Sequence, residues 1–273
     1  MYKKKYKNMI PKKIHYCWFG RGEKSPLIQY CINSWQKNKA DFEIIEWNED
    51  NFDVTQNIFV KEAYEQKKWA FVSDFARAKV LLDNGGFYLD TDMELKYPLS
   101  DFVNNKAICS FEAKYVPFSA FWGVEKGHQL AQDIVDYYNS LKQLDLTPCP
   151  KIFSELLVDQ YGINSAKDEM QFGKHDLVVF PSEYFSLDLP INYITHHFGG
   201  SWHDSWEEEN SGYKEMINSY GVVKRFIELR NGKSQIKHLI YDKNIFEIDQ
   251  ILDQIPLRYI INYTFSKLKK KLF

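Results

Sequence analysis

The sequence lacks a hydrophobic run long enough to cross a bilayer, closely spaced cysteines and any large net charge. A transmembrane helix needs about 18 consecutive apolar residues, and no run approaches this length. The four cysteines are scattered without a C-x-x-C pair, so zinc and thioredoxin-type sites are not indicated. The formal charge of −2 at pH 7 argues against nucleic acid as a partner. The chain also has no internal repeat and no low-complexity linker.

The first residues do not have the pattern of a secretory signal. They are basic, but Asn8 and the Pro-Lys-Lys stretch at 11–13 interrupt any apolar region. With unpaired thiols, this predicts a cytoplasmic protein. A length of 273 residues and a hydrophobic content of 44% predict a sizeable core, in one large α/β domain or one domain with an insertion.

The most informative feature present is the octet GGFYLDTD at residues 85–92. An apolar run ends in Asp90 and Asp92, and on an extended segment two such side chains point to the same face. Carboxylates that share a face at the end of a buried strand repel each other unless a cation lies between them. Mg²⁺ and Mn²⁺ prefer such oxygen ligands. The alternative is two solvated aspartates in a turn, which is common for isolated D-x-D motifs.

The stretch before the octet has the spacing of an amphipathic helix, with apolar residues at Phe71, Phe75, Ala78 and Leu82. Ser73 or Asp74 could cap this helix, or Asp74 could lie inside it, and the two glycines after Asn84 end it. Asp74 and Arg77 would share a helix face. They form either a surface ion pair of small value or a pair aimed at a polar ligand such as a sugar. The acids then lie beyond the carboxyl end of a strand, where open α/β sheets bind ligands.

Together these segments resemble the signature of the DXD sugar-transferases. This family contains capsular polysaccharide synthesis glycosyltransferases and yeast-type Golgi mannosyltransferases, and the glucosyltransferase domains of clostridial toxins are more distantly similar. The resemblance covers about residues 10–205. Besides Ser73-Asp74-x-x-Arg77 and the octet, its matching elements are PKKIHYCWFG at 11–20, Ser34-Trp35, EIIEW at 43–47 and ITHHFGGSW at 194–202.

The resemblance implies an α/β fold. We expect a single Rossmann-like GT-A nucleotide-sugar-binding domain with a mixed central sheet at residues 1–206, and a C-terminal helical extension at 207–273. It implies a metal-dependent glycosyltransferase that moves a hexose or N-acetylhexosamine from a nucleotide sugar, UDP-linked rather than GDP-linked. The acceptor would be a glycan or a polyprenyl-linked saccharide, with retention of configuration, in bacterial capsular or surface polysaccharide synthesis.

Catalytic roles and a metal site follow from the resemblance. Asp74, Arg77, Asp90 and Asp92 are the expected catalytic residues, with the first two holding donor-sugar hydroxyls. Asp90 and Asp92 are expected to bind Mn²⁺ or Mg²⁺. The resemblance also places a metal or diphosphate ligand in the late histidine element. Adjacent histidines on a strand point to opposite faces, so one of them is expected to act, and we favour His197 over His196 because it is nearer the glycines.

The nucleotide would be held by Trp18, Tyr88, Asp90, Ser201 and Trp202. In the family a tryptophan at the position of Trp18 stacks on the donor base, although an isolated tryptophan is more often core packing. Tyr88 would pack near the nucleotide, and Asp90 would contact the ribose or bridge to the metal. Ser201 and Trp202 carry an O–H and an N–H that suit a phosphate oxygen.

The segment 256–273 is basic and amphipathic. Its apolar residues can share a helix face beside Lys267 and Lys269 to Lys271, which is typical of a helix on an anionic membrane surface. A terminal helix docked on the domain is the alternative. A membrane site would suit a lipid-carried acceptor and predicts peripheral contact with the inner face of the cell membrane.

Two other functions use the same features. A metal-dependent phosphotransferase or nucleotide-sugar hydrolase would use the paired acids with water as the acceptor. A non-catalytic carbohydrate-binding protein would use the aromatic residues as platforms and the acids as a calcium site. The ordered set of motifs favours the transferase.

Overall fold

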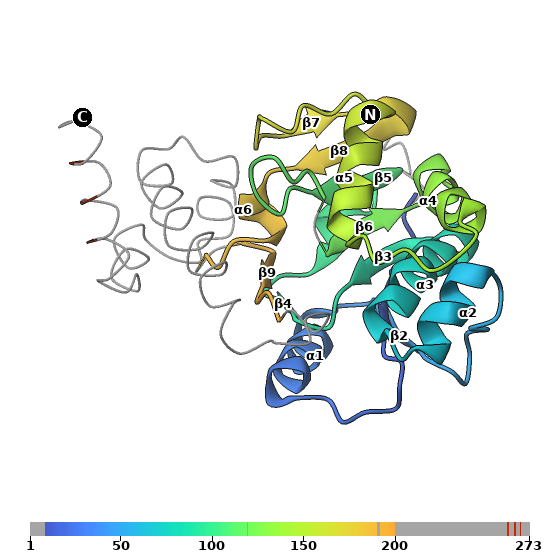
Figure 1. Ribbon diagram of the computed structural model, residues 1–273. Helices are drawn as coiled ribbons and strands as arrows, with labels where there is room; N and C mark the ends of the chain where they lie inside the picture. Colours follow the sequence, from blue (N-terminus) through green and yellow to red (C-terminus); the bar gives the residue numbers. More distant parts are fainter. Residues whose placement is uncertain are drawn as a thin grey trace, which may run out of the picture.

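The computed structural model describes residues 9–118, 120–189 and 192–199, and the single positions 261, 265 and 268. A mixed seven-stranded sheet runs in the order β2-β1-β3-β6-β5-β8-β7, and β4 pairs with β9 in a separate two-stranded sheet (Figure 1). The strands are β1 Lys13–Cys17, β2 Glu43–Trp47, β3 Gly86–Leu89, β4 Met93–Leu95, β5 Ala107–Ser110, β6 Phe121–Val124, β7 Gln171–Phe172, β8 Leu177–Phe180 and β9 Ile194–His196. The helices are α1 Pro26–Asn38, α2 Ile58–Glu65, α3 Trp69–Asn84, η1 Leu99–Phe102, α4 Gln129–Ser140, α5 Cys149–Asp159, η2 Lys174–Asp176 and α6 Ser182–Phe185.

The central sheet combines parallel and antiparallel pairs. Strands β1, β2 and β3 are parallel, β6 is antiparallel to both β3 and β5, and β8 is parallel to β5. The carboxyl ends of β1, β2, β3, β5 and β8 therefore lie at one edge of the sheet, and Asp90 follows β3 directly there. The prediction of an α/β fold with a mixed central sheet is confirmed.

Two apolar cores flank the sheet. One contains buried side chains of α2, α3, α4 and α5, with Phe75 and Tyr138 among them. The other contains buried side chains of α1 and α6 together with η1, including Trp35 and Phe185. The sheet is covered on both faces, which explains why β3 is a continuous buried run rather than an alternating one.

The turn between α3 and β3 depends on close backbone packing. Gly85 and Gly86 have φ of 64° and 116°, which side chains other than glycine rarely adopt. A Cβ on Gly86 would lie 2.8 Å from Nε2 of His15. That nitrogen is 2.9 Å from the carbonyl oxygen of Gly85, and Trp47 Nε1 donates to Nδ1 of the same ring at 3.0 Å. Burial lowers the pKa of His15 to about 4, so the imidazole is neutral and joins β1, β2 and the turn.

The structure decides between the alternatives that the sequence left open for the start of helix α3. The helix starts at Trp69 after Lys68, which makes no side-chain cap, so neither Ser73 nor Asp74 is the capping residue. The alternative that placed Asp74 inside the helix is the observed one. No helix among the described residues has the length and apolar character to cross a bilayer.

The predicted extension at 207–273 lies outside the described residues except for positions 261, 265 and 268, which are helical. Its division from the domain at 1–206 stays a prediction.

Candidate active site

The D-x-D motif forms a turn instead of continuing the strand. Strand β3 ends at Leu89, and the N–H of Met93 donates to the carbonyl of Asp90 at 3.1 Å. The prediction that Asp90 and Asp92 lie on an extended segment was therefore wrong. Because the backbone turns between them, Asp90 and Asp92 contact different parts of the fold. They remain near enough for Asp92 to raise the pKa of Asp90.

Arg77 links Asp90 to helix α3. Its Nη1 and Nη2 lie 3.2 and 3.1 Å from the two oxygens of Asp90, a bidentate arrangement. Its Nη2 also lies 2.9 Å from Oδ1 of Asp74. The guanidinium carbon is 4.8 Å from the ring centre of Tyr88, which is buried below it. The structure thus brings together four residues that the sequence analysis had placed in the site.

One guanidinium serves two carboxylates in this cluster. Burial raises the pKa of Asp74 to about 7. Arg77 opposes this shift, and the negative charge of Asp90 adds to it. Burial also raises the pKa of Asp90. Arg77 opposes this shift, and the negative charge of Asp92 adds to it. The side chains of Asp74 and Arg77 are almost fully buried, whereas that of Asp90 is 29% exposed. Asp90 is therefore the member of this cluster that a ligand reaches most easily.

Asp92 is held by the segment after β9. Its Oδ2 accepts from the N–H of Gly199 at 2.5 Å and lies 3.4 Å from Nε2 of His196. Burial opposes ionisation, but His196 and the Gly199 N–H outweigh it and lower the pKa of Asp92 to about 2. Burial would lower the pKa of His196, but Asp92 raises it to about 9. Asp92 and His196 are thus a charged pair in the buried edge of the site.

His197 contacts a different carboxylate from the one expected. Its Nε2 lies 3.1 Å from Oε2 of Glu94, whose other oxygen accepts from the hydroxyl of Tyr30 at 2.7 Å. His197 meets Asp92 only through its backbone N–H, which donates to the Asp92 carbonyl at 3.0 Å. The prediction favoured His197 as the metal ligand, but the imidazole beside Asp92 belongs to His196.

The register of β4 with β9 helps to determine which histidine contacts which acid. Met93 pairs with His196, so His197 lies opposite Asp92. Cross-strand partners normally share a face, but Asp92 lies in the turn and its carboxylate reaches His196 instead. His197 is then diagonal to Glu94 and contacts it. Glu94 was missed by the sequence analysis, although the alternation of acids at 90 and 92 continues to 94.

The donor set fits a divalent cation. Within the described ranges, no three His, Cys, Asp or Glu side chains form a closed metal cluster. Mg²⁺ and related ions, however, often bind through one or two carboxylates and take their remaining ligands from substrate phosphates and water. Nδ1 of His196 is buried without a hydrogen-bond partner among the described groups. Because His196 is protonated in its pair with Asp92, this Nδ1 carries a hydrogen and suits a phosphate oxygen, while the carboxylates suit the cation.

The predicted nucleotide residues are only partly within the described structure. Trp18 is half-buried at the end of β1, with its N–H donated to the carbonyl of Gly22 and Lys24 5.3 Å above its ring. Lys24 is paired with Glu46 at 3.0 Å, so this lysine is already neutralised. Ser201 and Trp202 lie outside the described residues.

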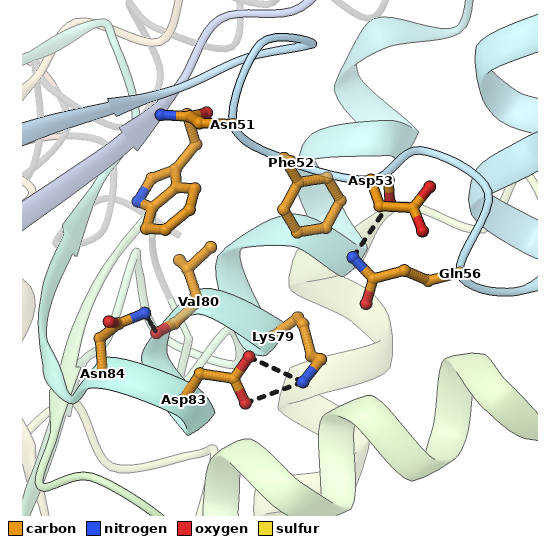
Figure 2. Close-up of a pocket in the computed structure, with 9 residues that line it drawn as sticks. Asn51, Phe52, Asp53, Gln56, Lys79, Val80, Asp83 and Asn84 are labelled. Carbon is orange, nitrogen blue, oxygen red and sulfur yellow. Dashed lines mark hydrogen bonds and ion pairs between the residues drawn. The ribbon is translucent and has the colours of Figure 1, made fainter.

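A cavity of about 220 Å³ lies at the other end of α3 (Figure 2). Trp47 and Phe52 line its apolar part, and Lys79 crosses to Asp83 at 2.7 Å on its polar side. None of the predicted site residues lines it. The chemistry of the acids, rather than this cavity, therefore identifies the candidate site.

Comparisons with known proteins agree with this location. Residues 25–110 match the family described as the glycosyltransferase sugar-binding region containing the DXD motif. The match spans all four predicted catalytic residues and confirms the resemblance to DXD glycosyltransferases over this part of the chain. No curated protein matches the sequence.

Similar solved structures are also glycosyltransferases. PaToxG glycosyltransferase has a TM-score of 0.42 and 20% identity, over 54% of this chain and 68% of that one. A glycosyltransferase involved in glycosylation of the major capsid of PBCV-1 has a TM-score of 0.42 and 9% identity, with coverages of 76% and 99%. The galactosyltransferase LgtC, in complex with donor and acceptor sugar analogs, has a TM-score of 0.33 and 11% identity, with coverages of 75% and 94%. Because all three TM-scores are below 0.5, the resemblance to glycosyltransferases rests on the family match over residues 25–110.

Proposed function

We propose that this protein is a metal-dependent glycosyltransferase that moves a hexose or N-acetylhexosamine from a nucleotide sugar, UDP-linked rather than GDP-linked. The proposed acceptor is a glycan or polyprenyl-linked saccharide, in capsular or surface polysaccharide synthesis. The main support is that the Arg77–Asp90 and Asp92–His196 pairs both lie beyond the carboxyl end of β3. Both aspartates lie within the segment that matches the DXD family.

The carboxylates of Asp90 and Asp92 would hold Mn²⁺ or Mg²⁺, with His196 rather than His197 as the neighbouring imidazole. When bound, the cation would stabilise negative charge on the diphosphate leaving group. The chain's own contribution is to orient both acids and to keep Asp92 ionised. The Gly199 N–H and His196 hold Asp92, and Arg77 holds both oxygens of Asp90.

The remaining roles follow from accessibility. Asp90 is the exposed member of its cluster, so we assign it to the ribose or the cation. Asp74 and Arg77 are paired with each other and nearly closed to solvent, so donor-sugar hydroxyls would have to share their hydrogen bonds. Trp18, at the end of β1, would stack on the base. Retention of configuration would follow from front-face attack by the acceptor hydroxyl on the donor sugar.

The test compares Asp92→Asn with Asp83→Asn, a change at an exposed carboxylate of the same region of sequence. Thermal unfolding is measured with UDP or GDP, with and without Mn²⁺, and then with UDP- and GDP-sugars. We expect UDP and Mn²⁺ together to raise the melting temperatures of the wild type and Asp83→Asn, but not that of Asp92→Asn. The unliganded melting temperature of Asp92→Asn should be lower than that of the wild type, because His196 loses its buried counter-charge. Transfer should be nearly abolished in Asp92→Asn.

Normal turnover of Asp92→Asn in the presence of Mn²⁺ would contradict the assignment. Hydrolysis of nucleotide sugar that no saccharide acceptor stimulates would favour the hydrolase. Glycan binding without any affinity for nucleotides would favour the carbohydrate-binding protein.

A further inference from the structure

Three side chains from separate segments meet on the surface beside the candidate active site. Tyr30 lies on α1, Glu94 on β4 and His197 directly after β9. The Tyr30 hydroxyl donates to Oε1 of Glu94 at 2.7 Å, and Nε2 of His197 lies 3.1 Å from Oε2 of the same carboxylate. The Tyr30 and His197 rings meet edge to face with their centres 6.3 Å apart. We call these three residues the Glu94 cluster.

Rigid elements hold the Glu94 cluster in place. Helix α1 lies beside β4 (Figure 1). The indole N–H of Trp35 donates to the carbonyl of Met93 at 2.6 Å. One turn further along α1, the side-chain amide of Asn38 donates to the carbonyl of Leu95 at 2.8 Å. The helix that carries Tyr30 is therefore fixed along the strand that carries the carboxylate, which is what a preorganised binding site needs.

The Glu94 cluster is open to a ligand and has unused hydrogen-bonding capacity. Tyr30 is 52% exposed, although its hydroxyl is held by Glu94. Among the residues that the structure describes, each Glu94 oxygen has one hydrogen-bond partner, and a carboxylate oxygen can accept two. Two neighbouring sugar hydroxyls can therefore donate to Glu94 while the ring of Tyr30 packs on the C–H face of the same sugar.

Charge restricts the class of ligand. Lys96, which follows β4, lies 3.9 Å from Asp188 and donates to the carbonyl of Leu189 at 2.6 Å. This pair is neutral as a whole, so the carboxylate of Glu94 leaves a net negative charge on this surface. Such a surface repels a diphosphate, whereas an uncharged, hydroxyl-rich ligand finds acceptors on it.

The Glu94 cluster is also close to the proposed cation site. The backbone N–H of His197 donates to the carbonyl of Asp92 at 3.0 Å. Glu94 follows Asp92 by two residues, and two residues of fully extended chain span at most about 7 Å. A sugar bound by Glu94 therefore lies next to the acid that we assign to the donor side of the reaction.

We propose that the Glu94 cluster is the binding site for the acceptor saccharide. Glu94 accepts hydrogen bonds from two sugar hydroxyls, and the Tyr30 ring packs on the sugar. His197 is a positioning residue that orients the carboxylate. This inference rests on the proposed transferase function and assigns the acceptor side of it, which the family match leaves open.

The experiment measures saccharide binding by the full chain without turnover. Saturation-transfer NMR uses the methyl glycosides of glucose, galactose, mannose and N-acetylglucosamine as probes. We expect Glu94→Gln to weaken binding at least about tenfold, because hydrogen bonds to a charged group become bonds to a neutral amide. Tyr30→Ala should weaken it by about as much, since the aromatic face is lost, and Tyr30→Phe should weaken it less.

Transfer assays with UDP-sugars and Mn²⁺ separate the acceptor from the donor. Glu94→Gln and Tyr30→Ala should raise the KM for the acceptor glycoside. The KM for the donor and the rate of donor hydrolysis without acceptor should stay at the wild-type values. A merely structural role of the cluster would move all three quantities together.

Matched controls carry the same chemical changes elsewhere. Glu65→Gln changes an exposed carboxylate of α2, and Phe172→Ala removes the exposed ring of edge strand β7. Both controls should bind saccharides like the wild type, and circular dichroism should show every variant folded.

The inference is overturned if the wild type binds none of the four glycosides, or if Glu94→Gln and Tyr30→Ala bind them like the wild type. Loss of stabilisation by UDP and Mn²⁺ in these two variants would also overturn it, because the cluster would then serve the nucleotide. A wild type that binds glycosides but is not stabilised by UDP and Mn²⁺ would instead refute the proposed transferase and leave a saccharide site without an acceptor role.

Discussion

Replacing Arg77 with methionine would leave two carboxylates at the sheet edge without their counter-charge. Arg77 makes two contacts with Asp90 and one with Asp74, and its side chain is only 7% exposed. Methionine has a similar length and helix propensity, so the change mainly removes charge and hydrogen bonds. Water cannot easily replace the guanidinium, because Asp74 is as deeply buried as Arg77.

The size of the effect follows from this burial. Removing one partner of a buried ion pair costs about 3–5 kcal/mol, because an uncompensated charge stays inside. Here the cost is moderated at Asp90, whose partial exposure lets water solvate it. We therefore expect Arg77→Met to lower the free energy of unfolding by about 3 kcal/mol or more. The melting temperature should fall by about 6 °C or more.

Lys79→Met is the control in the same helix. Lys79 pairs with Asp83 at 2.7 Å, but both side chains are open to solvent, and such a pair is worth about 0–1 kcal/mol (Figure 2). Urea unfolding followed by circular dichroism compares the two variants with the wild type. If Arg77→Met and Lys79→Met lose the same free energy, the assignment of Arg77 as the counter-charge of a buried acid cluster is refuted.

Two further predictions concern the turn before β3. The pKa of His15 is about 4 in the fold and about 6.5 when unfolded, so the unfolded chain binds more protons in this window. The contribution of His15 to the free energy of unfolding should therefore be fully present above pH 6.5 and be about 3 kcal/mol smaller at pH 4. His15→Gln should flatten this part of the profile of unfolding free energy against pH, and an unchanged profile would count against the buried neutral imidazole. Gly86→Ala should cost about 1–3 kcal/mol more than Gly127→Ala, since both have positive φ but only Gly86 is crowded by His15. Equal unfolding free energies for the two variants would show that crowding is unimportant.

Much of the local structure could be read from the sequence. The helix that ends at Asn84 and the strand at 86–89 follow from helical spacing, two glycines and an apolar run. The start of the same helix was left open, because no strong capping residue precedes Trp69 and Asp74 competes as a capping signal. The turn at the D-x-D motif was also missed, since an alternating acid pattern is compatible with an extended strand.

The candidate site was recognised as a set of residues, but their partners were not. Asp74 and Arg77 were expected to face a sugar, and in the structure they contact each other and Asp90. Spacing along one helix predicts that two side chains are neighbours. It does not reveal that a second acid, directly after the next strand, lies within 3.2 Å of the same guanidinium.

By itself, the sequence determined the elements whose causes are local: glycine conformations, apolar periodicity and the order of the motifs. Only the tertiary structure decided which histidine meets which acid. His196 and His197 are chemically identical and adjacent, and more than 100 residues separate each from its carboxylate. Their partners are set by the register of β4 with β9 and by the turn at Asp92. Register has this power because a shift of one residue moves every side chain to the opposite face of a strand.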